Sequence, residues 1–404
     1  MKIAIVGCGA LGSFYGAKLA RDGQEVRFLL RSDYETVRRR GVAIRSPDGD
    51  FTVRPRCSQT AEAIGVADLV LIGLKTTAND QFARLLAPLT GPRTALLTLQ
   101  NGLGNEERLA RLFPLEQILG GLCFVCLNRV APGVIQHIGH GAIVIGEFRR
   151  WPEPRTHDLA RMFRRADVPC DVTGDLARAH WEKLTWNIPF NGLGVASCAG
   201  YEAVITGRPP SREAQPLSPS LAARGGDVAS VRTALPLSVR NERGEGRGEG
   251  RPAADTPAHL PARRPSSPPS AGGEGEEHGA LNSYSEREGD RAGARGSDLA
   301  ALGPCLTTGE LLRDPRWAEL VRALMHEVIQ AARALGHNLA DVLADKQIER
   351  TKAMGDYKAS TLIDFERGRF LEMESLFLEP LRQAEKAGVA TPRLAALCEV
   401  LRGL

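Results

Sequence analysis

Three polar side chains stand at regular spacing in the stretch HWEKLTWNIPFNGLG, which is otherwise largely apolar. Lys183, Asn187 and Asn191 are four residues apart, so a helix here would place them roughly on one face. A lysine close to a ketone can donate a proton to its oxygen when hydride reaches the carbon, and burial lowers a lysine's pKa toward the working range. Asparagine amides are neutral donors that can orient a substrate. The alternative is a solvated lysine beside two amides that only cap or pack.

The beginning of the chain has the pattern of a dinucleotide-binding loop. In KIAIVGCGALGSFYGAKLA, a strand is followed by Gly7, Gly9 and Gly12 in the order G-x-G-x-x-G, and then by an amphipathic helix. The first glycine permits the tight turn, the second lets the backbone approach a pyrophosphate, and the third allows close helix–strand packing. The sequence therefore predicts a cofactor loop that also contains Cys8, Ala10 and Leu11.

The ends of three further strands carry polar side chains. After EVRFLL the chain continues with Arg31 where an NAD-binding protein would offer an acid to the ribose, which favours the 2′-phosphate of NADP. Lys75 ends LIGLK and Asn101 follows LTLQ, and ligands of open α/β sheets bind beyond the carboxyl ends of strands. The alternatives are an exposed arginine, a surface lysine and a simple Asn-Gly turn.

The fold class that these elements predict is α/β plus all-α. Strand and helix patterns alternate over 1–172, which indicates a Rossmann-type domain, with the runs GGLCFVC, GVIQHIG and GAIVIGE closer to a meander. Helical periodicity predicts a second domain over 173–206 and 298–404. Its expected helices cover 175–196, 309–335, 339–354 and 372–387, with a last one through Leu401.

The segment 207–297 interrupts the helical domain. It is rich in Pro, Gly, Ser, Arg and Glu, includes RGEGRGEG, and cannot bury enough apolar surface to form a core, so we predict a disordered, low-complexity insertion. A basic interaction tail is the alternative, but its arginines alternate with glutamates.

Removal of the insertion is expected to leave activity nearly unchanged, because the segment has no apolar periodicity with which to dock. The measurement is the activity of a chain that lacks 207–297, compared with the full chain. A collapse in solubility on trimming would contradict this expectation.

Composition excludes several classes of protein. The chain has 404 residues, 43% of them hydrophobic, and a formal charge of +4 that does not by itself indicate a nucleic-acid or membrane-surface partner. The eight cysteines form no disulfide framework, and CFVC has no second ligand pair for zinc, so no metal is expected. Glycines interrupt the first apolar run, and no run approaches the roughly 20 residues of a membrane span. We therefore expect a cytoplasmic protein.

Taken together, the motifs resemble those of the ketopantoate reductases (2-dehydropantoate 2-reductases), members of the 6-phosphogluconate dehydrogenase-like superfamily. The resemblance rests on GCGALGSFYGAKLA, LK, QNGLGNE, EKLTWNIPFN and STLIDFERGRFLEMESL in this order. It covers nearly the whole chain except the insertion. The sequence departs from many relatives at Phe377, where they carry a small or amide residue, and this leaves the substrate open.

The resemblance implies a role for each matching residue. Lys183 is similar to the general acid, and Asn187 and Asn191 to substrate-contacting amides. Asn101 resembles the residue between nicotinamide and substrate, and Lys75 the lysine of the cofactor crevice. The remaining matches are Ser360 and Glu372 for the substrate and Arg31 for the 2′-phosphate of NADPH. From the residues alone, Ser360 could instead be a helix cap and Glu372 an acid of a first helical turn.

The activity that the resemblance implies is NADPH-dependent reduction of 2-dehydropantoate to (R)-pantoate, on the route to pantothenate and coenzyme A. Such an enzyme is an oxidoreductase acting on a CH–OH group, with a small 2-oxo acid as its partner and no nucleic acid or membrane. A homodimer is one possible assembly, and the sequence does not give the oligomeric state. The alternatives are a related reductase of another 2-oxo acid, since a fold does not fix a substrate, or an NADP-binding protein whose catalysis the insertion impairs.

Overall fold

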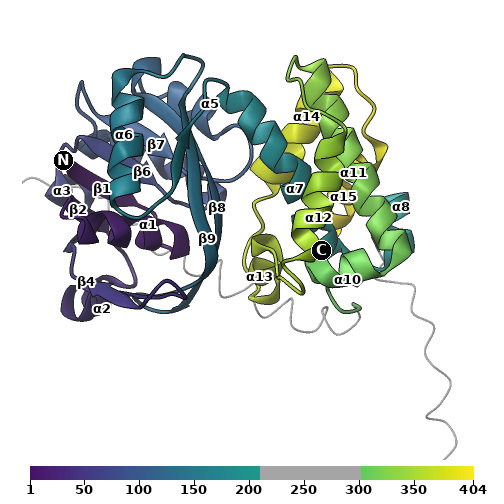
Figure 1. The fold of residues 1–404 in the computed structure, drawn as a ribbon, viewed down its shortest axis with the longest axis horizontal. Helices are drawn as coiled ribbons and strands as arrows, with labels where there is room; N and C mark the ends of the chain where they lie inside the picture. Colours follow the sequence, from purple (N-terminus) through teal and green to yellow (C-terminus); the bar gives the residue numbers. More distant parts are fainter. Residues whose placement is uncertain (210–301) are drawn as a thin grey trace, which may run out of the picture. The chain divides into compact units, whose positions relative to one another are not determined.

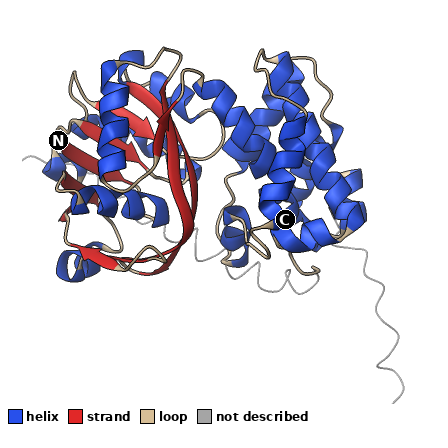
Figure 2. Ribbon diagram, viewed as in Figure 1, coloured by secondary structure: helices blue, strands red, loops and turns tan. Residues whose placement is uncertain are grey.

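A computed structural model of the chain describes residues 1–209 and 302–404, whose arrangement is shown in Figure 1. The expected insertion lies outside the described residues except for 207–209. The first part of the chain forms an α/β fold on one sheet, and the remainder is helical, as the red strands and blue helices of Figure 2 show. The predicted fold class is confirmed. None of the described helices is both long and apolar enough to cross a membrane.

The sheet brings together strands from the first 172 residues. Its strands are β1 (Lys2–Val6), β2 (Glu25–Leu29), β3 (Val42–Arg45), β4 (Phe51–Val53), β5 (Arg56–Ser58), β6 (Leu69–Ile72), β7 (Ala95–Thr98), β8 (Ile118–Ala131), β9 (Val134–Glu147) and β10 (Cys170–Val172). Their order is β4-β3-β9-β8-β7-β6-β1-β2-β5, and β10 pairs with β9. The run β7-β6-β1-β2 is parallel throughout, so the residues that follow these four strands meet at one edge of the sheet.

The last three apolar runs form a long hairpin and not a meander of three strands. GVIQHIG and GAIVIGE belong to one strand, β9, which pairs antiparallel with β8 and is interrupted by register shifts. His140 and Gly141 have φ angles of 63° and 136° and absorb the irregularity within the strand. The sequence expectation was wrong because a glycine inside an apolar run can mark a bulge as well as a turn.

Helices cover both faces of the sheet. They are α1 (Ala10–Arg21), α2 (Tyr34–Arg40), α3 (Ala61–Ile64), α4 (Phe82–Leu86), α5 (Asn105–Ala110) and α6 (Pro154–Arg165), with short 3₁₀ turns η1 (Thr76–Gln81), η2 (Ala87–Leu89) and η3 (Leu115–Gln117). Ile3 and Ile5 of β1 share a core with residues of α1 and α6. Ala4 and Val6 face the other core, with residues of α3, α4 and α5. The alternation of buried side chains on β1 thus sets the layers.

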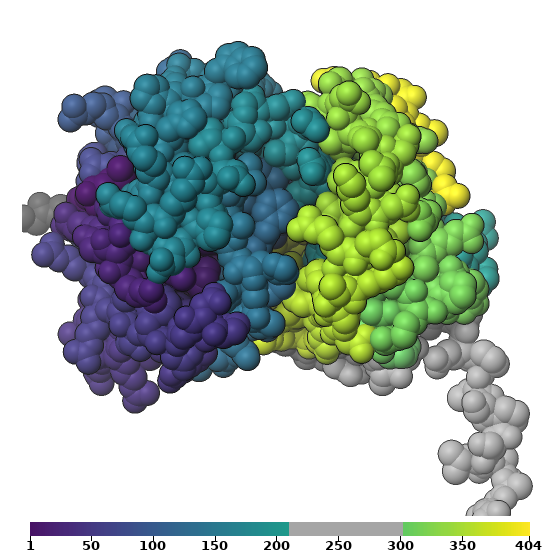
Figure 3. All heavy atoms as spheres, viewed as in Figure 1, coloured from purple at the N-terminus to yellow at the C-terminus, as the bar shows by residue number. Residues whose placement is uncertain are grey.

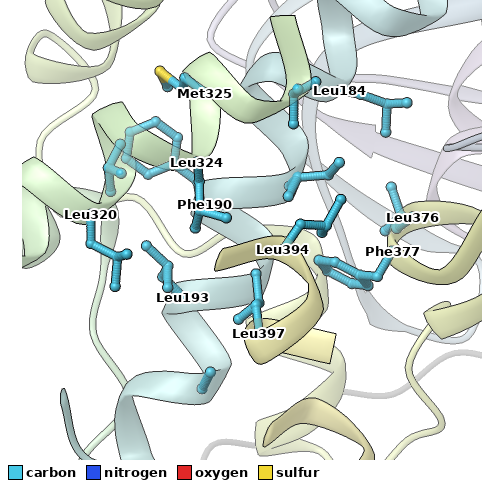
Figure 4. Close-up of a cluster of buried hydrophobic side chains, with 14 of the residues drawn as sticks. Leu184, Phe190, Leu193, Leu320, Leu324, Met325, Leu376, Phe377, Leu394 and Leu397 are labelled. Carbon is cyan, nitrogen blue, oxygen red and sulfur yellow. The ribbon is translucent and has the colours of Figure 1, made fainter. Parts of the chain in front are cut away.

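The helical part is built around α7 (Leu176–Ala196), which continues through Pro189. Around it lie η4 (Ser197–Ala199), α8 (Tyr201–Thr206), α10 (Thr308–Arg313), α11 (Pro315–Ala334), α12 (Val342–Lys352), α13 (Ser360–Glu366), the π-helical turn η6 (Glu374–Leu378), α14 (Glu379–Lys386) and α15 (Pro392–Gly403). Figure 4 shows how Phe190 and Leu193 of α7 pack with Leu324 of α11 and Leu397 of α15. This core fixes α7 and the polar side chains that it carries.

Three expected helices differ from the observed ones. The stretch 309–335 is two helices, because Pro315 has no N–H to continue α10 and Asp314 adopts extended backbone and caps α11 by accepting from the Arg316 N–H. The stretch 339–354 begins as a helix only at Val342. The stretch 372–387 starts with the π-helical turn, a form that sequence periodicity does not distinguish from an α-helix.

The chain segments on either side of the insertion pack against each other. Tyr201, at the start of α8, meets Trp317 of α11 edge to face, with ring centroids 5.0 Å apart. In Figure 3, teal atoms of the region before the insertion border green atoms of the region after it. The helical core is therefore continuous across the interruption in sequence.

Candidate active site

The glycine loop between β1 and α1 leaves open space where a phosphate could approach. Gly7 has a φ of +94°, and a Cβ there would lie 2.3 Å from the Leu74 backbone nitrogen. A Cβ on Gly12 would lie 2.3 Å from the Gly7 carbonyl oxygen, whereas one on Gly9 would meet no atom of the described residues within 4 Å. Gly7 and Gly12 are therefore required for packing. Gly9, the N-cap of α1, is the one whose side chain would enter the space in front of the helix N-terminus, which fits a bound pyrophosphate.

The acid nearest to the end of β2 already has partners. Asp33 is buried and accepts hydrogen bonds from the Arg129 guanidinium at 2.9 Å and the Gly133 N–H at 3.3 Å. Arg31 is exposed, and among the described residues its side chain is in no ion pair. The end of β2 thus presents an exposed cation and a carboxylate held by protein groups, which suits a 2′-phosphate better than a 2′-hydroxyl.

Replacement of Arg31 by alanine is expected to raise KM for NADPH about tenfold and to leave KM for NADH nearly unchanged. A charged hydrogen bond to a phosphate contributes about 1.5 kcal/mol or more, and only NADPH carries the 2′-phosphate. Initial rates with each cofactor measure the effect, with Arg39→Ala, an exposed arginine of α2, as the matched control. An equal change for the two cofactors would contradict the assignment of Arg31 to the 2′-phosphate.

Asn101 stands on a loop that is fixed from several sides. Gly102 has a φ of +85°, and a Cβ there would lie 2.2 Å from the Ser375 carbonyl oxygen, so the turn requires glycine. The Leu103 N–H donates to this same carbonyl at 2.9 Å, and the Asn105 amide donates to the Asn101 carbonyl at 3.1 Å. The Asn-Gly pair lies in a bend of the chain. The turn also directs the Asn101 side chain toward Lys183.

Lys183 is the cation that meets this loop. Its Nζ donates to Asn101 Oδ1 at 2.8 Å and lies 5.6 Å from the centre of the Phe124 ring. Burial lowers the pKa of Lys183, and the nearby Cys123 and Glu372 oppose this lowering only in part. A lysine with a lowered pKa gives up its proton more readily than a solvated one, which is what a general acid requires.

A second contact joins α7 to α5 beside this site. His180, one turn before Lys183, has its Nε2 3.1 Å from Glu106 Oε1, and both side chains are buried. Glu106 belongs to α5, which follows the Asn101 loop directly. The pair therefore fixes the distance between the element that carries Asn101 and the helix that carries Lys183.

The two asparagines of α7 have different surroundings. The Asn191 Oδ1 accepts from Ser360 Oγ at 3.3 Å and from the Thr361 N–H at 3.1 Å, so it also holds the first turn of α13. Asn187 is buried, and its amide has no hydrogen-bond partner within residues 1–209 and 302–404. Because no buried side-chain N or O atom of the described residues lacks a partner, the Asn187 amide atoms must be accessible, and they can donate to and accept from a substrate.

Lys75 meets the carboxylates of the C-terminal segment. Its Nζ lies 2.8 Å from Asp364 Oδ2 and 2.9 Å from Glu372 Oε2, and Glu372 Oε1 accepts from the Thr76 N–H at 2.9 Å. Burial alone would lower the pKa of Lys75, but the carboxylates of Glu372 and Asp364 outweigh it and raise this pKa well above the usual range. Lys75 is thus fixed as a cation, and Lys183 is the lysine suited to proton transfer.

Replacement of Glu372 by alanine is expected to lower the free energy of unfolding by about 2 kcal/mol, because the buried Thr76 N–H and one side of Lys75 lose their acceptor. Denaturant titration measures the change. Glu372→Gln keeps an acceptor oxygen and should recover part of the loss, and Glu374→Ala, on the exposed side of η6, is the control. Unchanged stability of Glu372→Ala would show that the contacts of Glu372 are dispensable.

The structure brings most of the predicted residues together in two groups. Gly7, Arg31, Lys75 and Asn101 follow β1, β2, β6 and β7, and so share one edge of the sheet. Lys183, Asn187, Asn191, Ser360 and Glu372 come from the helical part, and hydrogen bonds join Lys183 to Asn101 and Glu372 to Lys75. No described group of three or more His, Cys, Asp or Glu residues is placed to hold a metal ion.

Two neighbours of the site were not found from the sequence. Asp364 lies four residues after Ser360, and this helical spacing was a signal that could have indicated it. Phe124 comes from the middle of β8, in the apolar run GGLCFVC, yet it is 37% exposed and its ring lies beside Lys183. No local pattern marks that position.

The fold and the strand-end residues together define a dinucleotide-dependent oxidoreductase with a Rossmann-type domain and a helical domain. The family model of ketopantoate reductase PanE/ApbA matches residues 3–150, and that of its C-terminal part matches 295–404. The solved structure of 2-dehydropantoate 2-reductase from Geobacter metallireducens is 35% identical, with a TM-score of 0.71, and the match covers 100% of this chain and 99% of that one. The chain belongs to the ketopantoate reductase family, as its motifs predicted.

Two further relatives extend over almost their full length. A 2-dehydropantoate 2-reductase of Nostoc sp. is 29% identical over 409 aligned positions, which cover 100% of this chain and 95% of the relative. The solved structure of the enzyme from Methylococcus capsulatus is 26% identical, with a TM-score of 0.69, and the match covers 100% of this chain and 96% of that one. The two family models leave 151–294 unmatched, a stretch that includes α7.

Proposed function

We propose that this chain is an NADPH-dependent reductase that converts 2-dehydropantoate to (R)-pantoate, on the route to pantothenate and coenzyme A. The observation that carries the proposal is the hydrogen bond between Lys183 and Asn101, at the sheet edge that also carries the glycine loop. NADPH would supply the hydride. The family membership and the full-length relatives named 2-dehydropantoate 2-reductase support this substrate.

The chain's own residues would then divide the work. Lys183 donates a proton to the carbonyl oxygen of the substrate, and its lowered pKa favours the transfer. Asn187 and the Asn191 amide nitrogen, which has no hydrogen-bond partner among the described residues, orient the 2-oxo acid, with Ser360 next to them. Asn101, which would lie between nicotinamide and substrate, holds the Lys183 ammonium, and Glu372 fixes Lys75 at the edge of the site.

We further propose that the enzyme is cytoplasmic and has no nucleic-acid or membrane partner. Its formal charge of +4 over 404 residues supports this, since it gives no strongly basic surface from composition. A homodimer is the assembly to test, by light scattering of the purified protein.

The experiment that tests the function mixes the purified full chain with NADPH and 2-dehydropantoate and follows the cofactor absorbance. Oxidation of NADPH that depends on 2-dehydropantoate is the expected result. Turnover only with other 2-oxo acids would show that the substrate is a different 2-oxo acid, while the proposed reduction by NADPH would stand. Binding of NADPH without turnover of any 2-oxo acid would show that the chain has lost catalysis.

A further inference from the structure

The chain returns from the insertion next to the end of α7. The Gly303 N–H donates to the Cys198 carbonyl at 2.8 Å, and the Leu306 N–H lies 2.9 Å from Ser197 Oγ. These bonds, on either side of Cys305, hold its backbone next to that of Cys198. Two residues far apart in the sequence thus occupy adjacent positions at the two ends of the inserted segment.

The two side chains also meet. The Cys198 and Cys305 thiols are close enough to shift each other's pKa, and Cys305 Sγ lies 3.8 Å from the Val195 carbonyl oxygen of α7. Cys198 is 4% exposed and Cys305 is half-buried, and both are free thiols in this structure. A small oxidant could therefore reach the pair without unfolding the core.

Cys198 differs chemically from the other cysteines. The neighbouring Cys305 thiol lowers the pKa of Cys198, although burial opposes this, and Cys198 in turn raises the pKa of Cys305. Burial raises the pKa of each of the other six: Cys8, Cys57, Cys123, Cys126, Cys170 and Cys398. Since the thiolate is the reactive form, Cys198 is the favoured site of oxidation.

We propose that Cys198 and Cys305 are a redox-active dithiol, which hydrogen peroxide converts to a disulfide that closes the inserted segment into a covalent loop. This inference is independent of the proposed function, because neither thiol belongs to the site described above. The disulfide would tie the end of α7, and hence the helix that carries Lys183, to the returning chain.

The reaction balances with peroxide as the only oxidant. The Cys198 thiolate attacks one peroxide oxygen, the O–O bond breaks, and a sulfenic acid forms as hydroxide leaves and takes up the proton that the thiol released. The Cys305 sulfur then attacks the sulfenic sulfur, forms the S–S bond and displaces the hydroxyl group, which leaves as water with the Cys305 proton. Two thiols lose two electrons, and one peroxide becomes two waters.

Peptide mapping of the full-length protein tests the proposal. The reduced protein is treated with hydrogen peroxide, its remaining thiols are blocked, and it is digested and analysed by mass spectrometry with and without a reductant. We expect a reducible cross-link between the Cys198 and Cys305 peptides to form before any other. A map without this link, or with links spread over several cysteines, would overturn the proposal.

Three variants sharpen the result. In Cys305→Ser, oxidation should stop at a Cys198 sulfenic acid, which dimedone traps, and in Cys198→Ser neither the link nor the trapped adduct should form at this pair. Cys57→Ser, at a half-buried thiol whose pKa burial raises to about 11, should leave the link unchanged. Loss of the Cys198–Cys305 link in Cys57→Ser would contradict the proposal that these two thiols form a specific pair. If a variant folds poorly, the peptide map of the wild-type protein still tests the proposal.

Discussion

Replacement of Lys183 by methionine is expected to lower kcat for reduction of 2-dehydropantoate by about 10²- to 10⁴-fold, the range that general acid catalysis contributes. Methionine keeps the length and the apolar stem of the side chain, so the packing around Phe124 should persist. What disappears is the proton donor that Asn101 holds at 2.8 Å. Stopped assays at high enzyme concentration measure the residual rate.

The pH dependence of kcat should identify the same group. The protonated ammonium of Lys183 is the active form, so the rate should fall as pH rises through the pKa of Lys183. Because burial lowers this pKa, the fall should begin below the range of an ordinary lysine. In Lys183→Met the alkaline limb should be absent, because no titrating donor remains.

A matched control separates the loss of the donor from the loss of a positive charge. Lys352 is exposed on α12 and pairs with Glu349 at 2.6 Å, and Lys352→Ala should keep the wild-type rate and pH profile. Lys183→Met should still bind NADPH, since its position is not part of the glycine loop. If Lys183→Met retained more than a tenth of the wild-type kcat, Lys183 would not be the general acid.

Much of the site follows from rules that act locally or at one edge of the sheet. The turn of Gly7, Gly9 and Gly12 could be predicted because a strand, a G-x-G-x-x-G loop and a helix stand together at the chain start. Arg31, Lys75 and Asn101 could be grouped because they follow parallel strands. The placement of Lys183, Asn187 and Asn191 on one face of α7 could be predicted from the helical period alone.

The remaining contacts depend on tertiary structure that no local pattern encodes. Lys75 and Glu372 are separated by 297 positions, and the sequence offered each one a role without indicating that they pair. Phe124 had no role in the sequence analysis at all, and it stands partly exposed next to Lys183, at a register shift in the pairing of β8 with β9. The break between α10 and α11 is a different case, because the pair Asp314-Pro315 is a signal for the end of a helix that can be recognised in the sequence. The expectation of one helix over 309–335 relied on the apolar periodicity and did not use this signal.

Replacement of Gly9 by alanine is expected to weaken NADPH binding about a hundredfold, about 2.8 kcal/mol, without destabilising the protein. The added Cβ would meet no atom of residues 1–209 and 302–404 within 4 Å, so the fold should accept it. In the complex, the same methyl group would enter the space in which backbone and pyrophosphate approach each other. Titration of NADPH fluorescence measures the binding, and thermal unfolding measures the stability.

Alanine substitutions at two other glycines serve as controls for Gly9→Ala. Gly139→Ala, on β9, also adds a Cβ into open space but far from the loop in sequence, and it should bind NADPH like the wild type. Gly12→Ala would place a Cβ 2.3 Å from the Gly7 carbonyl oxygen and should lower the melting temperature as well as binding. If Gly9→Ala bound NADPH as tightly as Gly139→Ala, the loop would be a structural turn and not a phosphate site. Loss of binding with retained stability is the result that only a phosphate site explains, because the methyl group then has nothing but the cofactor to meet.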